Sequence, residues 1–267
     1  MNTRRIFGLV LRYLYLYRRS LPRLIEIFYW PTLELVLWGF ITLFLSNSEM
    51  FGNSTFVTNV LQFLIGAIIL WEVFLRSSLG VSIGFLEELW SKNLFNLFVT
   101  PLNEHEFLAG ILATGFIKIF ASFIVTSIIA WLLYTFNIFS LGPSLLPFVL
   151  NLLFSGWVFG IFATAVILRY GVGAEVLAWG IAFAIQPFAA VFYPVSVFPQ
   201  WLQSIAGFLP LSHVFEGMRS VITTGQIPVA ELAWAFGLNF GYLFAAVSFF
   251  MYMFRIARQR GYLLRTE

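Results

Sequence analysis

The sequence predicts an all-α integral membrane protein with six transmembrane helices, an amphipathic N-terminal interfacial helix, a cytoplasmic helix between spans 2 and 3, and re-entrant outer helices between spans 5 and 6. Sixty per cent of the 267 residues are hydrophobic and 10% are charged, which is more apolar surface than one water-soluble core of this size can bury. The apolar residues form long continuous runs, unlike the alternating segments of a transmembrane barrel. Because backbone polar groups in lipid must be satisfied within the protein, such runs indicate helices.

Six segments are long enough to cross the hydrocarbon core of a bilayer, for which a helix needs about 20 apolar residues. They are residues 24–46, 56–80, 107–136, 145–168, 174–193 and 229–254. No long linker, low-complexity tract or convincing internal repeat interrupts them, so we expect residues 1–267 to form a single membrane domain.

Basic residues are concentrated on one side of the predicted spans. If the amino terminus is inside, Arg219 is the only basic residue in the outer segments. The inner segments then hold Arg4, Arg5, Arg12, Arg18, Arg19, Arg23, Lys92, Arg169, Arg255, Arg258, Arg260 and Arg265. Since cytoplasmic loops are enriched in Lys and Arg, both termini are predicted to lie in the cytoplasm, which agrees with an even number of spans.

Residues 1–23 are predicted to form an amphipathic helix in the inner membrane interface. Their apolar side chains recur near helical spacing, while Arg5, Arg12 and Arg19 follow one another at intervals of seven on another face. Arginines in this position can bind the phosphates of anionic membrane lipids. The alternative is a charge cluster that serves only to orient the first span.

Residues 85–106 connect the second and third spans on the inner side and contain a predicted amphipathic helix. Its candidate contact residues are Glu87, Glu88, Leu89, Lys92, Leu94, Leu97, Phe98 and Pro101. The leucines and the phenylalanine form an apolar face, the glutamates and the lysine form a charged face, and the proline ends the helix. Because the charged face is not basic, docking of another protein is favoured over plain anchoring in the interface.

Residues 194–228 lie on the outer side and are too apolar for a solvated loop. Pro194 and Pro199 lack an amide donor and disfavour helix in the residue before them, so the fifth span is predicted to end near Tyr193. Two short helices follow, separated at Pro210. We expect them to dip into the outer leaflet or to lie on it.

Four charged residues lie within or beside the predicted spans, where an unpaired charge costs a few kcal/mol near the bilayer centre. They are Glu34, Glu72, Arg76 and Lys118. Glu72 and Arg76 are four apart with the acid first, which favours an ion pair, either for neutralisation or as part of a hinge or gate. Glu34 has no obvious local partner and is a candidate for contact with another subunit or a ligand. Lys118 can extend its ammonium group to the inner interface, so it is not expected to bind a ligand.

Several chemistries lack their residues in this sequence. There is no phosphate-binding GxxxxGK[ST] loop, no HExxH or GxSxG motif, and no cysteine. The two histidines, His105 and His213, are predicted on opposite sides of the membrane, which argues against a zinc site. We expect this chain to be no enzyme, to hold no catalytic residues, metal ion or cofactor of its own, and to have no nucleic-acid partner.

The order of these motifs resembles a known family. The run from Glu87 and Glu88 through Leu94 and Leu97 to Thr100-Pro101-Leu102 and Glu106, followed by the outer pattern YPVSVFPQWLQSIAGFLPLSHVFEGMR, is similar to the permease subunits of ABC-2-type exporters over nearly the whole chain. The resemblance implies a homodimer of six-span subunits in the bacterial cytoplasmic membrane. It also implies that the inner faces dock two ATP-binding cassette subunits, which carry ATP and Mg²⁺.

The resemblance assigns roles to two segments. Residues 86–100 would form the coupling helix that docks the ATPase subunit. An outer gate would be shaped by Pro194, Pro199, Trp201, Pro210, Glu216 and Arg219. One departure is Lys92-Asn93, which stands where the family usually has a small Gly-Thr pair.

The function implied by the resemblance is ATP-driven export of an amphiphilic or hydrophobic small molecule or lipid. Export of a polysaccharide or glycolipid is an alternative, but the sequence lacks the arginine-tyrosine run and Gly-x-x-Trp motif that polysaccharide members often show. An ion-coupled secondary transporter or channel would need charges on a continuous path, and Glu34, Glu72 and Lys118 are few for that. The missing motifs argue against an intramembrane enzyme.

Overall fold

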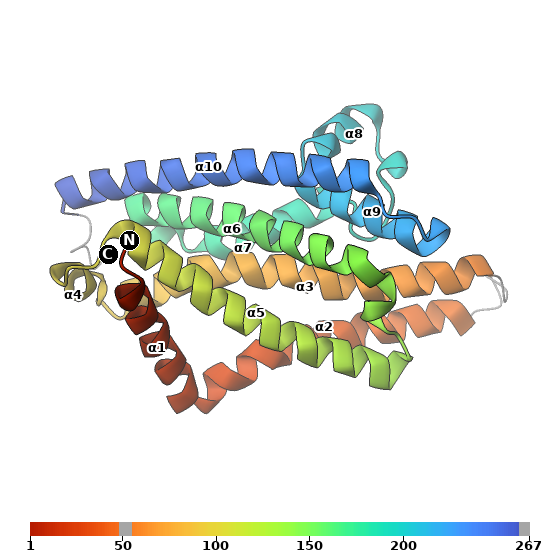
Figure 1. Cartoon of the computed structure of the whole chain (residues 1–267), viewed down its shortest axis with the longest axis horizontal. Helices are drawn as coiled ribbons and strands as arrows, with labels where there is room; N and C mark the ends of the chain where they lie inside the picture. The colour runs from red at the N-terminus through yellow and green to blue at the C-terminus, as the bar shows by residue number, and fades with distance from the viewer. Residues whose placement is uncertain (48–54, 262–267) are drawn as a thin grey trace.

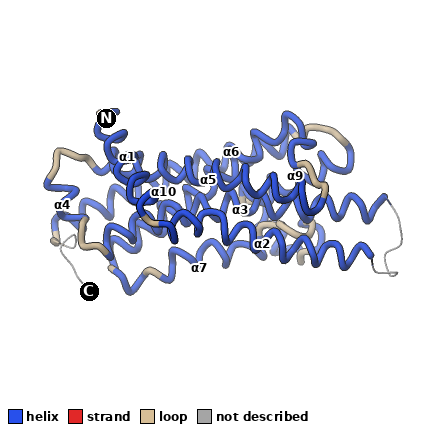
Figure 2. Tube along the Cα trace, turned by 90° about the horizontal axis from the view of Figure 1, so that it is seen from below, coloured by secondary structure: helices blue, strands red, loops and turns tan. Residues whose placement is uncertain are grey.

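The computed structural model describes residues 1–47 and 55–261, with side chains described for residues 1–44 and 62–261. Within this part of the chain the structure is helical and has no strand (Figure 2). The long helices lie roughly along one axis and form an elongated bundle (Figure 1). The side chains of residues 56–61, at the start of the predicted second span, and Arg265 lie outside the described residues.

The α-helices are α1 (Thr3–Arg19), α2 (Leu21–Asn47), α3 (Thr55–Trp90), α4 (Leu94–Val99), α5 (Glu104–Tyr134), α6 (Leu145–Tyr170), α7 (Val176–Ile185), α8 (Gln200–Gly207), α9 (Pro210–Thr224) and α10 (Val229–Gln259). Short 3-10 helices are η1 (Ile138–Ser144), η2 (Val172–Ala174), η3 (Gln186–Phe188) and η4 (Val195–Val197). Figures 1 and 2 place α1 and α4 at one end of the bundle and α9 toward the other. We call these the inner end and the outer end, after the predicted orientation.

Five stretches of the described chain are long and apolar enough to cross a membrane. They are Leu21–Phe44, Gln62–Trp90, Glu104–Tyr134, Ile138–Tyr170 and Val229–Gln259. The chain is therefore an all-α membrane protein. These stretches coincide with the predicted first, second, third, fourth and sixth spans.

The predicted fifth span, residues 174–193, is built differently from the others. Helix α7 has 10 residues and rises about 15 Å, which is about half the thickness of the hydrocarbon core. Pro187 in the following η3 has no amide hydrogen with which to continue an α-helix. The apolar stretch Val172–Phe188 is therefore shorter than the five long ones. Nevertheless, α6 ends at the inner end and α10 begins at the outer end, so residues 171–228 connect the two ends (Figure 1).

Helix α3 forms the centre of the bundle. It packs against α2, α5 and α6, and α10 packs against α6 (Figure 1). Most of the α3 side chains are buried, including Trp71, Phe74 and Phe85, whereas α2, α5 and α10 bury only a minor part of their apolar stretches. The apolar surface that stays exposed on these three peripheral helices is suited to contact with lipid.

Two glycines allow α6 to lie very close to α3. A Cβ atom on Gly156 would lie 2.6 Å from the carbonyl oxygen of Phe74, and one on Gly160 would lie 2.5 Å from the carbonyl oxygen of Ser78. Small residues four apart are a common signal for close helix packing in membranes, where van der Waals contact drives association. The sequence predictions above did not use this signal.

A buried polar cluster joins α6 to α10. The amide of Asn239 donates to both the backbone and the side-chain oxygen of Asn151 at 3.0 Å, and its own oxygen accepts from Ser155 at 2.9 Å. In lipid, such hydrogen bonds between helices replace water as the partner of a polar group.

Candidate functional site

The inner end is fastened by an ion pair between α1 and α3. Arg12 donates to the two carboxylate oxygens of Glu88 at 2.7 and 3.2 Å, and Glu88 is 2% exposed. The side chain of Asn93 donates to the same carboxylate at 2.6 Å. A buried charge that loses such partners is costly, so this contact fixes the position of α1 on α3.

A second contact joins α1 to the start of α5. Glu106 accepts hydrogen bonds from the backbone N–H groups of Asn2 at 2.6 Å and Asn103 at 3.2 Å, and it pairs with Arg5 at 3.4 Å. The Asn103 contact satisfies a free donor at the beginning of α5, as in a capping box.

These ion pairs give two arginines of the amino-terminal helix partners within the protein. Arg5 and Arg12 remain more than a third exposed, so their contact with lipid phosphates stays a prediction. Their carboxylate partners were not predicted, because they are 101 and 76 residues away in sequence and no local pattern reveals them. Arg19 remains exposed.

The surroundings of the contact between α1 and α3 raise the pKa of two side chains of α1. Burial opposes the charge of Arg12, but hydrogen bonding and attraction to Glu88 outweigh it and raise the pKa of the guanidinium. Burial, together with the negative charge of Glu88, raises the pKa of the neighbouring Tyr13. Both side chains therefore keep their protons.

The predicted coupling helix, residues 86–100, is divided between two helices. Helix α3 ends at Trp90 and α4 begins at Leu94. Between them Lys92 has a φ of 55°, the left-handed conformation in which helices commonly end. This turn changes the direction of the chain, so the apolar face predicted for one continuous helix does not exist as such.

The side chains predicted to form the apolar docking face pack into this chain. Leu94 is 2% exposed, and Leu89 and Leu97 contact the core of the inner end. The ring of Phe98 lies 4.8 Å from that of Phe254 on α10. These contacts hold α4 against the bundle, while Leu89, Leu97 and Phe98 remain partly exposed, so their docking role stays a prediction.

A different apolar set is exposed at the same place. Trp90, Phe95 and Val99 are 47%, 49% and 69% exposed, and we call these three residues the α4 face. The sequence interpretation missed them because it continued one helical period through the turn at Lys92. The spacing of four between Phe95 and Val99 within α4 was the signal that could have revealed them.

The other predicted docking residues have separate surroundings. Glu87 accepts a hydrogen bond from the hydroxyl of Tyr17 at 3.4 Å, so it faces α1. Lys92 and Pro101 are exposed, and the carbonyl oxygen of Pro101 accepts from Arg5.

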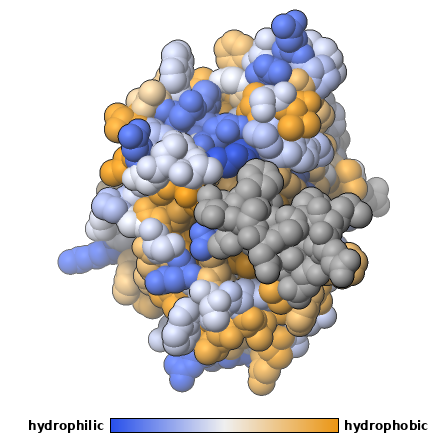
Figure 3. Space-filling model, turned by 90° about the vertical axis from the view of Figure 1, so that its right-hand side faces the viewer, coloured by the Kyte–Doolittle hydropathy of each residue, from blue (hydrophilic) through white to orange (hydrophobic). Residues whose placement is uncertain are grey.

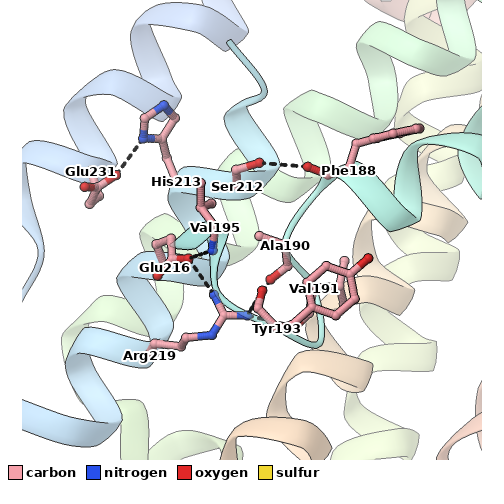
Figure 4. A network of polar contacts seen from close by, with 10 residues as sticks. All are labelled: Phe188, Ala190, Val191, Tyr193, Val195, Ser212, His213, Glu216, Arg219 and Glu231. Carbon is pink, nitrogen blue, oxygen red and sulfur yellow. Dashed lines mark hydrogen bonds and ion pairs between the residues drawn. The ribbon is translucent and has the colours of Figure 1, made fainter. Parts of the chain in front are cut away.

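At the outer end, Arg219 of α9 holds the chain that follows η3 (Figure 4). Its Nη2 donates to the carbonyl oxygens of Ala190 and, at 2.7 Å, Tyr193, and its Nη1 lies 3.0 Å from Glu216. Glu216 also accepts from the backbone N–H of Val195 at 2.6 Å. Burial lowers the pKa of Arg219, although Glu216 opposes this, and the guanidinium stays charged because an arginine titrates far above neutral pH.

The remaining predicted gate residues mark boundaries in this region. Pro194 precedes η4, Pro199 precedes α8, and Pro210 is the first residue of α9. Trp201 is exposed on α8. Of the six predicted gate residues, only Glu216 and Arg219 form the ion pair that their spacing predicts. Figure 3 views the molecule from this end and shows hydrophilic side chains among hydrophobic ones.

His213 connects α8, α9 and α10 at the outer end. Its Nδ1 lies 2.5 Å from a carboxylate oxygen of Glu231 on α10, and its Nε2 lies 2.9 Å from the carbonyl oxygen of Gly207 (Figure 4 shows the first contact). Both contacts are hydrogen bonds when both ring nitrogens carry a hydrogen. Among the described residues, neither this site nor any other brings together three or more potential ligand side chains that could hold a metal ion.

The charged residues of the spans form a cluster. Glu72 and Arg76 of α3 form the predicted ion pair, with Arg76 Nε 2.9 Å from a carboxylate oxygen. The carboxyl group of Glu34 on α2 interacts with both of them. Glu34 therefore has partners within this chain, on a neighbouring helix, which the search for a local partner overlooked.

A pocket lies beside this cluster, between the end of α1, the start of α2, α3 and α5. Its cavity volume is about 80 Å³, and it is open on one side. Its polar wall is formed by Tyr17, Arg23, Glu26, Arg76, Glu87 and Lys118. The ammonium group of Lys118 donates to the hydroxyl of Tyr17 on α1 at 3.0 Å. Since α1 is the predicted interfacial helix, the reach of Lys118 toward the inner interface stays a prediction.

No family model matches this chain, and no curated protein matches it. The candidate functions therefore depend on the α4 face, the outer network and the charged pocket.

Proposed function

We propose that this chain is the transmembrane permease subunit of an ATP-driven ABC exporter in the bacterial cytoplasmic membrane. Two copies would assemble with two ATP-binding cassette subunits, which bind ATP and Mg²⁺, and would move an amphiphilic molecule or lipid outward. The sequence contributes the resemblance to ABC-2-type permeases, and it contains no phosphate-binding loop of its own.

The observation that carries the proposal is the α4 face. Trp90, Phe95 and Val99 are exposed apolar side chains at the end of the bundle that also bears most of the arginines. Exposed apolar groups outside a membrane span are typical of a protein contact. Because α4 directly follows the central helix α3, a subunit that pushes on α4 would move the core of the bundle.

The outer end supports the part of the proposal that concerns outward transport. Residues 171–228 would supply a sixth crossing of composite build, with α8 and α9 as re-entrant helices at the outer surface. Arg219 and Glu216 would hold this segment closed until α3 moves, since Arg219 also lies over the ring of Phe63 on α3, 4.2 Å from its centroid. The even number of crossings would leave both termini in the cytoplasm.

A paired set of variants tests the docking role of the α4 face. The double variant Phe95→Ser, Val99→Ser should lose at least about tenfold in affinity for the ATPase subunit, because buried aromatic and aliphatic anchors dominate such interfaces. The control is the double variant Phe7→Ser, Leu16→Ser, which removes exposed apolar side chains from α1 at the same end. The measurements are co-purification of the ATPase subunit and ATP-dependent export from inverted vesicles.

A cluster of charges within the spans favours one alternative, an ion-coupled transporter. Glu34, Glu72 and Arg76 meet between α2 and α3, where carboxylates are able to carry protons. Transport driven by an ion gradient in vesicles that hold this chain alone would support the alternative and contradict the exporter.

A further inference from the structure

The pocket between α1, α2, α3 and α5 has unsatisfied charges of both signs. Arg76 is engaged by Glu72 at 2.9 Å, so it has a partner. Arg23, Glu26 and Lys118 form no ion pair with a described residue, and neither does Glu87. Two cations and two carboxylates thus line one hollow without neutralising one another in direct contact.

Hydrogen-bonding capacity is left over on these groups. Lys118 has three N–H donors and uses one for Tyr17, while the guanidinium of Arg23 has only a distant contact with the Tyr17 ring, 6.0 Å from its centroid. Burial raises the pKa of Tyr17, so the phenol stays neutral and bridges Lys118 to Glu87 without adding a charge. Glu87 accepts a single hydrogen bond, at 3.4 Å, and is able to accept more.

The backbone of α2 lacks one helical hydrogen bond beside the pocket. Pro31 lies inside α2 and has no amide hydrogen for the carbonyl oxygen of Ile27, four residues earlier, and Ile27 is one of the residues that line the pocket. An uncompensated carbonyl at membrane depth is unfavourable unless a ligand or water satisfies it.

Apart from Ser122, the rest of the pocket wall is apolar. Leu79 and Ile83 of α3 and Ile119 of α5 line it, and the pocket is open on one side. The open side and these side chains suit a hydrocarbon chain, whereas a small polar solute would gain nothing from them.

We infer that this pocket binds the headgroup of a zwitterionic amphiphile, with an anionic phosphate on Lys118 and Arg23 and an ammonium group on Glu26 and Glu87. Opposite charges on the ligand match the two signs of the wall, while the acyl chains leave through the open side along α3 and α5. The inference requires only that the chain is embedded in a membrane, and it holds with or without an ATPase partner.

Lipid retention by the purified full-length chain, measured by native mass spectrometry, tests the inference without ATP or a second subunit. The probes are phosphatidylethanolamine, phosphatidylglycerol, which lacks the ammonium group, and soluble phosphoethanolamine, which lacks the acyl chains. We expect phosphatidylethanolamine to be retained at least about tenfold better than either of the others, because charge-assisted hydrogen bonds are lost with each omission.

Two variants locate the binding in this pocket. Lys118→Gln should weaken retention of phosphatidylethanolamine about tenfold, whereas Arg169→Gln, which removes an exposed charge at the same end, should not. Gly115→Leu should also weaken retention of phosphatidylethanolamine, because its side chain would fill the hollow. A Cβ atom at Gly115 meets nothing within 4 Å. Gly180→Leu on α7 is its control, since that position is equally open.

The outcomes that overturn the inference are distinct. Equal retention of phosphatidylethanolamine and phosphatidylglycerol would show that the ammonium group does not contribute to binding. Full competition by soluble phosphoethanolamine would show that the acyl chains contribute nothing. Unchanged retention in both Lys118→Gln and Gly115→Leu would place the lipid elsewhere, and none of these results would bear on the docking of an ATPase at α4.

Discussion

The side chain of Arg219 holds the irregular stretch of chain that follows η3. Its guanidinium joins carbonyl oxygens of the chain after η3 to the carboxylate of Glu216 (Figure 4). Ala190 has a positive φ of 54°, an unusual conformation for a residue with a side chain, and its carbonyl is one of the bound groups. The arginine therefore compensates for the backbone polar groups that no helix satisfies there.

Replacing Arg219 with lysine should destabilise the outer end. A lysine keeps the charge but lacks the planar fork that reaches several acceptors at once, so at least one charged hydrogen bond is lost, at a cost of about 1.5–3 kcal/mol. The melting temperature of the detergent-solubilised chain should fall for Arg219→Lys and stay unchanged for Arg255→Lys, since Arg255 is exposed. Equal melting temperatures for the two variants would show that the network of Figure 4 does not hold this segment.

At the scale of single residues, the sequence predicted pairs that are close along one helix and missed those that are not. The spacing of Glu72 and Arg76 was sufficient to predict their ion pair. The contact between Arg12 and Glu88 was not predictable, because 76 residues separate them and the fold alone brings them together. The hydrogen bond between Lys118 and Tyr17 was not predictable for the same reason, since Tyr17 comes from another helix.

At the scale of helices, close packing between α3 and α6 determines where the central helix lies. Gly156 and Gly160 bring the two backbones together, and Ser77 on α3 donates to the carbonyl oxygen of Leu153 at 2.8 Å. Composition and hydrophobic length predicted that both helices exist. Which face of each helix packs against the protein was harder to predict, because a helix surrounded by lipid and protein is apolar on all sides and shows little periodicity.

Alanine substitutions at two helical glycines should change stability in opposite directions. At Gly156 a Cβ atom would lie 2.3 Å from the Cβ of Ser77, so α6 must move away from α3, at a cost of about 1–3 kcal/mol. At Gly237 on α10 a Cβ atom meets nothing within 4 Å, so alanine should stabilise the helix by up to about 1 kcal/mol. Thermal unfolding of the two variants in the same detergent measures both effects, and a stable Gly156→Ala variant would contradict the close approach.

The positions at which helices begin and end were predicted well where apolar runs are continuous and poorly where a turn interrupts them. The predicted second span ends at residue 80, whereas α3 continues to Trp90, because Phe85 and Leu86 of its inner turns lie in the buried cluster of the inner end. The predicted fifth span was extended past Gln186-Pro187, although proline is the residue least suited to continue a helix. The turn at Lys92 was missed because its left-handed conformation cannot be recognised from the types of residue at this position.

At the scale of the whole molecule, the two ends of the bundle have different chemistry. The inner end carries α1, its arginine contacts and the α4 face, while the outer end carries the Arg219 network and the short helices α8 and α9 (Figure 1). The central helix α3 touches elements at both ends, including α1 through Arg12 and α9 by direct packing. In the proposed exporter, movement of α4 would therefore reach the outer segment along this one helix.

Site-directed labelling tests whether the α4 end faces the cytoplasm, where an ATPase subunit can reach it. The chain contains no cysteine, so Ser91→Cys at the α3–α4 turn and Gln226→Cys after α9 each introduce a single thiol at an exposed position. In intact cells treated with a membrane-impermeant maleimide, we expect that Gln226→Cys is labelled and that Ser91→Cys is labelled only after the membrane is opened. Labelling of Ser91→Cys in intact cells would show that the α4 end faces the exterior, where no ATPase subunit can reach it.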